Sequence, residues 1–263
     1  MKSKILNINA KNETGVRPNV AYSNMLDQKR YMYALNFIRD KDVLDCASGV
    51  GWGSFLLANG GAKTVVGLDL SPIAINTSKL YYSSSNVDFI LGDLSEIDLN
   101  KKFDVITSFE TLEHVDNPLD FLRCLKKNIK PNGLLLLSTP NGYCTKNEGE
   151  KPYNPYHSEE FTRDELFQLL EKAGWCVDKY MGQHPIQEGA KDVMIYRDFN
   201  RQYWNAMRRI EKYGLFYRIF NKFRSRFFGL SSDPAQRYHC NPELIKSGFQ
   251  PVYHYVMAHP MSE

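Results

Sequence analysis

Two hydrophobic patterns alternate between residues 42 and 139. Short, continuous apolar runs are typical of buried strands, and they begin at Val43, Val65, Val87, Phe103 and Leu134. The segments between these runs place apolar residues at helical spacing. This alternation predicts an α/β domain in which crossover helices connect the strands of a parallel sheet.

Helix boundaries are marked by capping residues. Apolar positions within 21–39 predict a helix before the first strand, and Asn117-Pro118 opens a helix over 117–128. Thr162 and Glu165 have the spacing of a capping box, and the helix that they begin ends at Gly174. Residues 175–181 and 249–258 are predicted to form the last two strands.

The segment between these last strands is too long for a hairpin loop, so we expect a helical insertion over 184–246. Its phenylalanines form one helical stripe at Phe216, Phe220, Phe223 and Phe227. Ten Lys and Arg and three Asp and Glu lie between 191 and 226. Such a helix suits a lid or a dimer contact. Alternatively, 191–228 contacts a membrane surface or a lipid-linked or anionic acceptor.

The chain is therefore divided into four parts. Residues 1–40 form an arm and a helix, 41–183 the α/β core, 184–246 the insertion, and 247–263 the final strand and tail. No apolar run reaches the roughly 18 residues of a membrane span. The net charge of +3 requires no nucleic acid partner, and the five scattered cysteines indicate neither zinc nor disulfides. These features favour a cytoplasmic protein.

The first strand leads into a glycine turn. Asp45 ends the strand, Gly49, Gly51 and Gly53 follow, and a helix begins directly afterwards. A strand, a glycine turn and a helix form the nucleotide-binding corner of an open α/β sheet. The dinucleotide pattern G-x-G-x-x-G requires a third glycine where this chain has Ser54, so an NAD-linked oxidoreductase is disfavoured.

Acidic residues end three further strands. Asp69 lies twenty residues after Gly49, the distance at which a carboxylate accepts hydrogen bonds from a ribose diol. The alternative for Asp69 is a helix-capping role before Ser71-Pro72. Asp93 and Glu110 also follow apolar runs, as expected if a ligand binds at the carboxyl ends of the strands.

The sequence resembles the class I S-adenosylmethionine-dependent methyltransferases, first in the segment from Asp45 to Ser54. The segments Gln28–Tyr31, Ser108–Val115, Ser138–Asn141 and Tyr156–Thr162 are similar to bacterial sugar and surface-glycan O-methyltransferases. This resemblance implies a seven-stranded, Rossmann-like, doubly wound sheet whose last two strands are antiparallel. It also implies that S-adenosyl-L-methionine is the cofactor and S-adenosyl-L-homocysteine the product. The residues that it places at the cofactor are Tyr31, Asp45, Gly49, Gly51, Asp69, Leu70, Asp93, Leu94 and Glu110.

Two histidines are candidates for proton transfer from an acceptor alcohol. His114 follows the fourth strand and His157 precedes the capped helix, both on the acceptor side of such sheets. A structural role is the alternative for each. Asn141 and Tyr156 are candidate substrate contacts, and no set of side chains has the spacing of a metal site.

We expect an S-adenosylmethionine-dependent O-methyltransferase that acts on a sugar, a nucleotide-sugar or a capsule or lipopolysaccharide precursor. One alternative is a small-molecule N- or O-methyltransferase outside glycan metabolism. Another is a non-catalytic, cofactor-binding scaffold. A homodimer is compatible with each.

Overall fold

The computed structural model describes residues 25–94, 99–187, 193–194, 197–198, 200–202, 205 and 249–262. Its strands are β1 (Asp42–Cys46), β2 (Thr64–Asp69), β3 (Val87–Leu91), β4 (Phe103–Phe109), β5 (Ile129–Pro140), β6 (Trp175–Gln187) and β7 (Phe249–Pro260). They form a seven-stranded sheet in the order β3-β2-β1-β4-β5-β7-β6. The helices are α1 (Met25–Ala34), α2 (Trp52–Asn59), α3 (Pro72–Tyr81), α4 (Pro118–Asn128), α5 (Gly142–Thr145) and α6 (Arg163–Lys172), with a short 3₁₀ turn, η2 (Leu112–His114). A mixed sheet with flanking helices confirms the predicted α/β fold.

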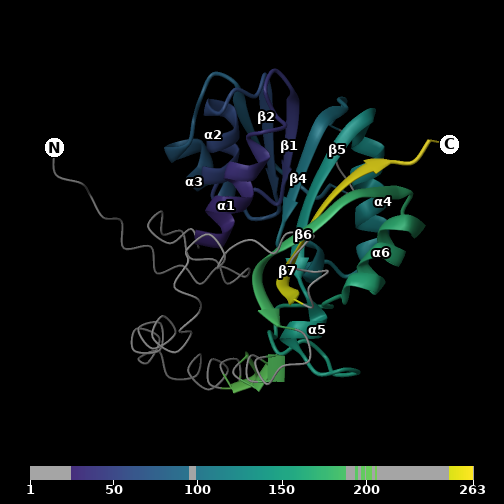
Figure 1. Ribbon diagram of the computed structural model, residues 1–263. Helices are drawn as coiled ribbons and strands as arrows, with labels where there is room; N and C mark the ends of the chain where they lie inside the picture. The colour runs from purple at the N-terminus through teal and green to yellow at the C-terminus, as the bar shows by residue number, and fades with distance from the viewer. Residues whose placement is uncertain are drawn as a thin grey trace, which may run out of the picture. The chain divides into compact units, whose positions relative to one another are not determined.

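The chain divides into two compact units. The first combines Met1–Thr107 with Asn128–Lys130 and contains β1, β2, β3 and most of β4. β1 pairs in parallel with β2 and β4, and β2 pairs in parallel with β3. In Figure 1, α1, α2 and α3 lie beside one another along these strands. Because β1 is central, its residues Val43, Leu44 and Asp45 are fully buried.

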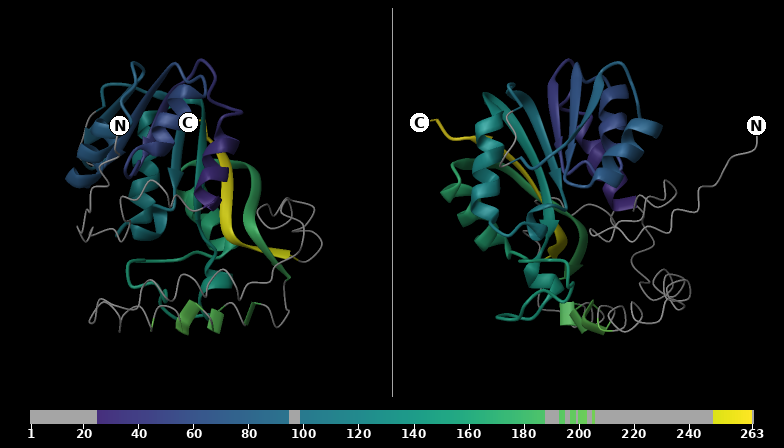
Figure 2. Two further views of the ribbon diagram at one scale, coloured as in Figure 1. Left: turned by 90° about the vertical axis from the view of Figure 1, so that its left-hand side faces the viewer. Right: turned by 180° about the vertical axis from the view of Figure 1, so that it is seen from behind.

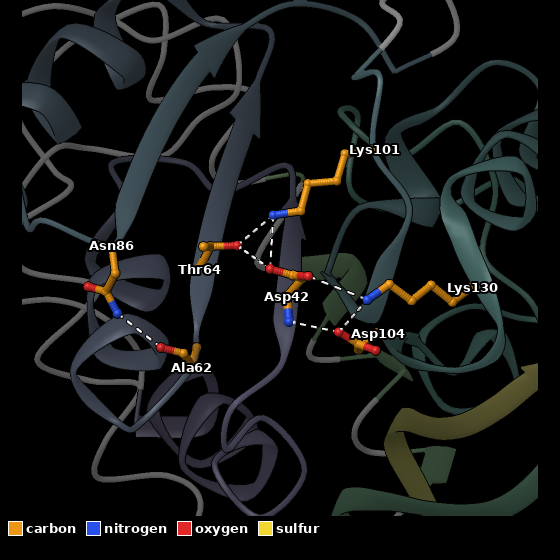
Figure 3. Close-up of polar contacts among 7 residues, drawn as sticks. All are labelled: Asp42, Ala62, Thr64, Asn86, Lys101, Asp104 and Lys130. Carbon is orange, nitrogen blue, oxygen red and sulfur yellow. Dashed lines mark hydrogen bonds and ion pairs between the residues drawn. The ribbon is translucent and has the colours of Figure 1, made fainter.

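A charged cluster joins the starts of three segments in the first unit (Figure 3). The carboxylate of Asp42 accepts hydrogen bonds from Thr64 at 2.7 Å and from Lys101 at 3.0 Å. Lys130 donates to Asp104 at 2.8 Å, and Asp104 accepts from the backbone N–H of Asp42 at 2.9 Å. The lysines alternate with the acids, so this cluster ties the beginnings of β1, β2 and β4 together. It lies at the strand ends opposite to the glycine turn.

The second unit combines Ser108–Lys127 with Pro131–Glu263. Within it, β7 pairs antiparallel with β5 on one side and with β6 on the other. The indole of Trp175, at the start of β6, donates to the carbonyl oxygen of Leu122 at 3.0 Å and so attaches α4. α4 and α6 lie along these strands in the right-hand view of Figure 2. The predicted antiparallel arrangement of the last two strands is confirmed.

The predicted helix caps are present. Ser71 accepts a hydrogen bond from the backbone of Ala74 at the start of α3, and Thr162 and Glu165 form the capping box of α6. α4 begins at Pro118, as expected from Asn117-Pro118. α1 ends at Ala34, so the predicted helix over 21–39 is too long at its C-terminal end.

Some boundaries differ from the prediction. β5 begins at Ile129 and includes Pro131, whereas the apolar run predicts a strand that begins at Leu134. Proline fits an extended backbone at the open end of a strand, which explains why the strand continues through it. β6 extends to residue 187, three residues beyond the predicted start of the insertion. The aromatic stripe of the insertion lies outside the described residues. Among the described residues, no helix has the length and apolar character needed to cross a membrane.

Candidate functional site

The glycine turn after β1 has a left-handed backbone at every second residue. The φ angles are +62° at Ala47, +54° at Gly49 and +87° at Gly51. Gly53 lies instead inside α2, where a β carbon would come within 2.2 Å of the Tyr31 ring. Gly51 has a left-handed backbone that favours glycine, and a larger residue would also not fit there, because its β carbon would lie 2.5 Å from the β carbon of Ser78. The turn therefore includes an alanine, Ala47, in a conformation that favours glycine.

Asp45 is held by three hydroxyl groups in the interior of the first unit. Its side chain is fully buried, and it accepts hydrogen bonds from Ser54 at 2.6 Å, Thr107 at 2.7 Å and Tyr31 at 3.0 Å. Burial raises the pKa of the Asp45 carboxyl, and the three hydroxyl groups oppose that rise. Tyr31 therefore connects α1 to the end of β1.

Asp69 connects the end of β2 to the glycine turn. Its carboxylate accepts hydrogen bonds from the backbone N–H of Gly49 at 2.7 Å and from that of Ser71 at 2.9 Å. Burial raises its pKa, and the two N–H groups act in the opposite direction. The next residue, Leu70, is 66% exposed.

The first unit has the features that an adenosine-containing cofactor requires. Among the described residues, no atom would lie within 4 Å of a β carbon on Gly49, as the close approach of a flat ligand to this backbone requires. The hydroxyl of Ser48 is buried and has no partner among the described residues. Asp93 is half-buried and Leu94 is buried at the end of β3. These residues fit the cofactor that the sequence predicted.

Glu110, the last of the predicted cofactor contacts, belongs to the second unit. Its backbone is left-handed, with a φ angle of +52°. Its N–H donates to the carbonyl oxygen of Ser138, and the hydroxyl of Ser138 donates to its carboxylate at 2.9 Å. This strained conformation turns the chain from β4 into η2.

Nδ1 of His114 is engaged in a hydrogen bond, and Nε2 has no hydrogen-bond partner among the described residues. Its Nδ1 lies 2.8 Å from the carbonyl oxygen of Tyr156. A carbonyl oxygen only accepts, so Nδ1 carries the proton and Nε2 keeps its lone pair in the neutral ring. Nε2 lies 3.9 Å from the buried carboxylate of Glu113. Burial lowers the pKa of His114, and the proximity of His157 lowers it further. The ring thus suits a proton acceptor near neutral pH.

His157 packs against His114 but has partners at both nitrogens. The two ring centroids lie 4.8 Å apart with an angle of 85° between the planes. Nδ1 of His157 lies 2.6 Å from the carboxylate of Glu160, and Nε2 lies 2.6 Å from the side-chain amide of Asn154. The structure therefore brings the two predicted histidines together, but it gives only His114 a ring nitrogen suited to accept a proton.

The two predicted substrate contacts have different surroundings. Asn141 is fully buried, accepts from the backbone of Tyr143 and donates to the carbonyl oxygen of Pro251 at 2.8 Å. These bonds cap α5 and attach it to β7, so the geometry gives no support to a substrate contact at Asn141. Tyr156 is 39% exposed and lies beside His114, where a contact with an acceptor remains a prediction.

Two buried acids in the second unit were not predicted as site residues. Glu113 accepts a hydrogen bond from Thr139 at 2.9 Å, and Glu160 accepts one from Thr145 at 2.5 Å. Ligand atoms of Glu113, His114 and His157 all lie within 4.8 Å of one another, although no metal site was expected. Since both nitrogens of His157 already have protein partners, we assign no metal to this group. The sequence contains no local signal for Glu160 beyond its position three residues after His157.

Comparison with known proteins defines the class. A family described as a methyltransferase domain matches residues 23–180, more than half of the chain. A probable S-adenosylmethionine-dependent methyltransferase of Mycolicibacterium smegmatis is 33% identical over 143 residues, 54% of each protein. The mitochondrial ubiquinone biosynthesis O-methyltransferase of Schizosaccharomyces pombe is 34% identical over 163 residues, 56% of this chain and 59% of that protein. The chain spans little more than half the length of these curated relatives.

Solved structures support the fold. The S-adenosylmethionine-dependent methyltransferase of Mesorhizobium loti has a TM-score of 0.52 and 17% identity, with 89% of this chain and 99% of that one covered. The complex of DhpI with S-adenosylhomocysteine has a TM-score of 0.51 and 16% identity, with 90% and 85% covered. The chain belongs to the methyltransferase family, and its cofactor is S-adenosylmethionine. The predicted class and cofactor are thereby confirmed, whereas a glycan acceptor and the individual site residues stay predictions.

Proposed function

We propose that this chain is an O-methyltransferase in which Nε2 of His114 takes the proton of an acceptor hydroxyl. The hydrogen bond from His114 to the carbonyl oxygen of Tyr156 carries this proposal, because it leaves Nε2 as the basic atom. The lowered pKa keeps the ring neutral at pH 7. An alcohol needs such a base, because its neutral oxygen is a weak nucleophile.

The residues of the first unit would hold the cofactor. The backbone at Gly49 and Gly51, the carboxylate of Asp69 and the exposed side chain of Leu70 are the proposed contacts with its adenosine part, together with Asp93 and Leu94. Asp45 is proposed to face its amino-acid part. When bound, S-adenosylmethionine supplies an electrophilic methyl group on a sulfonium.

Glu113 is proposed to assist the proton transfer. Once Nε2 of His114 has taken a proton, the carboxylate of Glu113 at 3.9 Å stabilises the imidazolium. Glu113 is itself held by Thr139, so it need not reorient. The His114 side chain is 40% exposed, and the proton can leave to water afterwards.

The proposed acceptor is a sugar hydroxyl of a nucleotide-sugar or a capsule or lipopolysaccharide precursor. Sugar hydroxyls are weakly acidic and depend strongly on a base, and Tyr156, whose backbone carbonyl bonds to His114, is 39% exposed. A phenolic small molecule is the second candidate, because one of the relatives is named a ubiquinone biosynthesis O-methyltransferase. A dimer, a membrane contact through 191–228 and a cytoplasmic location remain predictions.

Methyl transfer from a labelled donor tests the proposal. Purified protein is incubated with nucleotide-sugars and, separately, with a catechol, and each product is identified by mass spectrometry. His114→Gln is expected to lower kcat about a hundredfold or more. His259→Gln is the matched control, because His259 is exposed and its ring pairs with Asp178.

Each outcome separates the candidate functions. Methylation of a sugar oxygen supports the proposal, and methylation of the catechol alone favours the second candidate. Cofactor binding without transfer to either class would favour a scaffold. Full activity of His114→Gln would remove His114 from the mechanism. Activity lost with EDTA and restored by Mg²⁺ would assign Glu113 and His114 to a metal instead of to metal-free proton transfer.

A further inference from the structure

A chain of side-chain contacts leads away from His114 into the interior of the second unit. The ring of His157 packs edge-on against that of His114. Nδ1 of His157 lies 2.6 Å from the carboxylate of Glu160, and the other carboxylate oxygen accepts from the hydroxyl of Thr145 at 2.5 Å. The fold thus connects an exposed candidate base to a buried acid through a second histidine.

The orientation of His157 is fixed by this acid and by Asn154. An ionised carboxylate only accepts, so Nδ1 of His157 donates to Glu160. The amide oxygen of Asn154 accepts from the backbone N–H of Tyr156 at 3.1 Å, which turns its NH₂ group toward Nε2 of His157. Both ring nitrogens are therefore assigned, and the ring has one hydrogen-bonded orientation.

The same loop also places His114 by backbone contacts. The N–H of Ser158 donates to the carbonyl oxygen of Glu113 at 2.7 Å, and the carbonyl oxygen of Tyr156 accepts from His114. His157 lies between these two points of contact. A shift of its ring would move the surface against which the His114 ring packs.

Burying the carboxylate of Glu160 costs free energy, because the charged group loses its contact with water. Only 2% of Glu160 is exposed, and its hydrogen-bond partners are a histidine and a hydroxyl. A buried carboxylate held in this way contributes little net stability compared with an apolar side chain of similar size. Its position is better explained by the orientation that it imposes on His157.

Thr145 connects Glu160 to described residues of the insertion. The side-chain amide of Asn200 donates to the carbonyl oxygen of Thr145 at 2.6 Å, and Arg197 donates to that of Tyr143 in the same short helix, α5. Val193 packs with Cys144 in a small buried cluster. The spacing of 193, 197 and 200 places these three on one helical face toward α5.

We propose that Glu160 is a positioning residue for methyl transfer, which holds His157 against His114 and, through Thr145, links the base to the start of the insertion. This proposal rests on the proposed function of His114. The charged or titratable groups that face His114 are Glu110, Glu113, His157 and Glu160. The negative charge of Glu160 raises the pKa of His114, so neutralising it lowers that pKa further.

Glu160→Gln tests the proposal with little change of shape. The glutamine oxygen can still accept from His157, and its NH₂ group can donate to Thr145. Glu159→Gln is the matched control, since Glu159 is exposed and adjacent and undergoes the same change of charge. In the full chain, we expect Glu160→Gln to lower kcat about tenfold or more, with the acceptor KM changed less than about twofold, because only the placement of the base is affected.

A second readout does not depend on turnover. The titration of the His114 ring, followed by NMR, is expected to move to lower pH in Glu160→Gln and to stay unchanged in Glu159→Gln. An unchanged titration of His114, or a shifted titration with an unaltered kcat, would overturn the proposal. If no acceptor is methylated by the wild-type protein, the proposed function fails, and the titration alone still decides whether Glu160 acts on His114.

Asn154→Ala provides a second variant in case Glu160→Gln does not fold. It removes the amide that fixes Nε2 of His157 but leaves the buried carboxylate in place. We expect kcat to fall and the melting temperature to change little. Wild-type kcat in this variant would contradict the proposal, because His157 would then need no fixed orientation.

Discussion

The Nδ1–H of His114 donates to the carbonyl oxygen of Tyr156, 42 residues further along the chain. This bond leaves Nε2 to act as the base, and burial lowers the pKa of the ring below the ordinary value of 6.5. Because the neutral ring is the active form, kcat should increase as the pH rises through that pKa. We expect the midpoint of the acidic limb to lie below pH 6.5. Steady-state kcat measured from pH 5 to 8 tests this.

The His114→Gln variant is the control for this profile. Glutamine does not titrate, so the acidic limb should disappear together with most of the activity. A limb that persists in His114→Gln would show that another group controls the profile.

We expect the substitution Ala47→Gly to stabilise the folded protein. The φ angle of +62° at Ala47 places a β carbon in the left-handed region, which costs an ordinary residue about 1–2 kcal/mol. Part of the gain from glycine is offset by greater chain entropy in the unfolded state, so Ala47→Gly should raise the free energy of unfolding by about 0.5–1 kcal/mol. Urea denaturation measures this change.

Ala58→Gly is the opposite control. Ala58 lies inside α2, where glycine costs about 1 kcal/mol relative to alanine. Destabilisation by both substitutions would show that the backbone at Ala47 is not strained.

Tyr31→Phe removes one of the three hydroxyl groups that hold Asp45. Hydrogen bonds to buried charged groups are worth about 1.5–3 kcal/mol, and Ser54 and Thr107 remain, so we expect a loss of about 1–2 kcal/mol in unfolding free energy. The ring itself should still cover Gly53. Equal stability of Tyr31→Phe and of Tyr33→Phe, a control in the same helix, would deny a role to this hydroxyl.

We expect the free energy of unfolding to depend on pH because of His254. This histidine is fully buried, accepts from the hydroxyl of Tyr180 and donates to the carbonyl oxygen of Phe161, and burial lowers its pKa from 6.5 to about 4. In the unfolded chain, His254 binds a proton as the pH falls below 6.5. In the folded chain, it binds that proton only near pH 4. The contribution of neutral His254 to the free energy of unfolding is therefore complete above pH 6.5. It is lost as the pH falls from 6.5 to about 4, by about 3 kcal/mol in total.

Urea denaturation at several pH values measures this loss. His254→Gln does not titrate at this position, so its unfolding free energy should depend less on pH over the same interval. The same slope in both proteins would assign the loss to other groups.

The sequence predicted those features that depend on neighbouring residues. Asp45 and Asp69 end apolar runs, and Thr162 and Glu165 lie three residues apart, so local patterns were sufficient for these strand ends and for the helix cap. The class followed from the same segments.

Contacts between distant segments could not be predicted in this way. Tyr180 and His254 are 74 residues apart, and His254 had no local signal for burial. Asn141 is a predicted substrate contact, and no local pattern indicates that its side chain bonds to Pro251, 110 residues away. Local patterns also do not report φ angles, so Ala47 was not recognised as part of the glycine turn.

Cofactor binding tests the central claim most directly, namely that the glycine turn and Asp69 hold S-adenosylmethionine. Isothermal titration with S-adenosylhomocysteine should give one saturable site with a dissociation constant of about micromolar order, within the range usual for enzyme ligands. Asp69→Ala should abolish this binding while Asp88→Ala, which changes an exposed acid on β3, retains it. Full binding by Asp69→Ala, or binding of NADH in place of S-adenosylhomocysteine, would contradict the account.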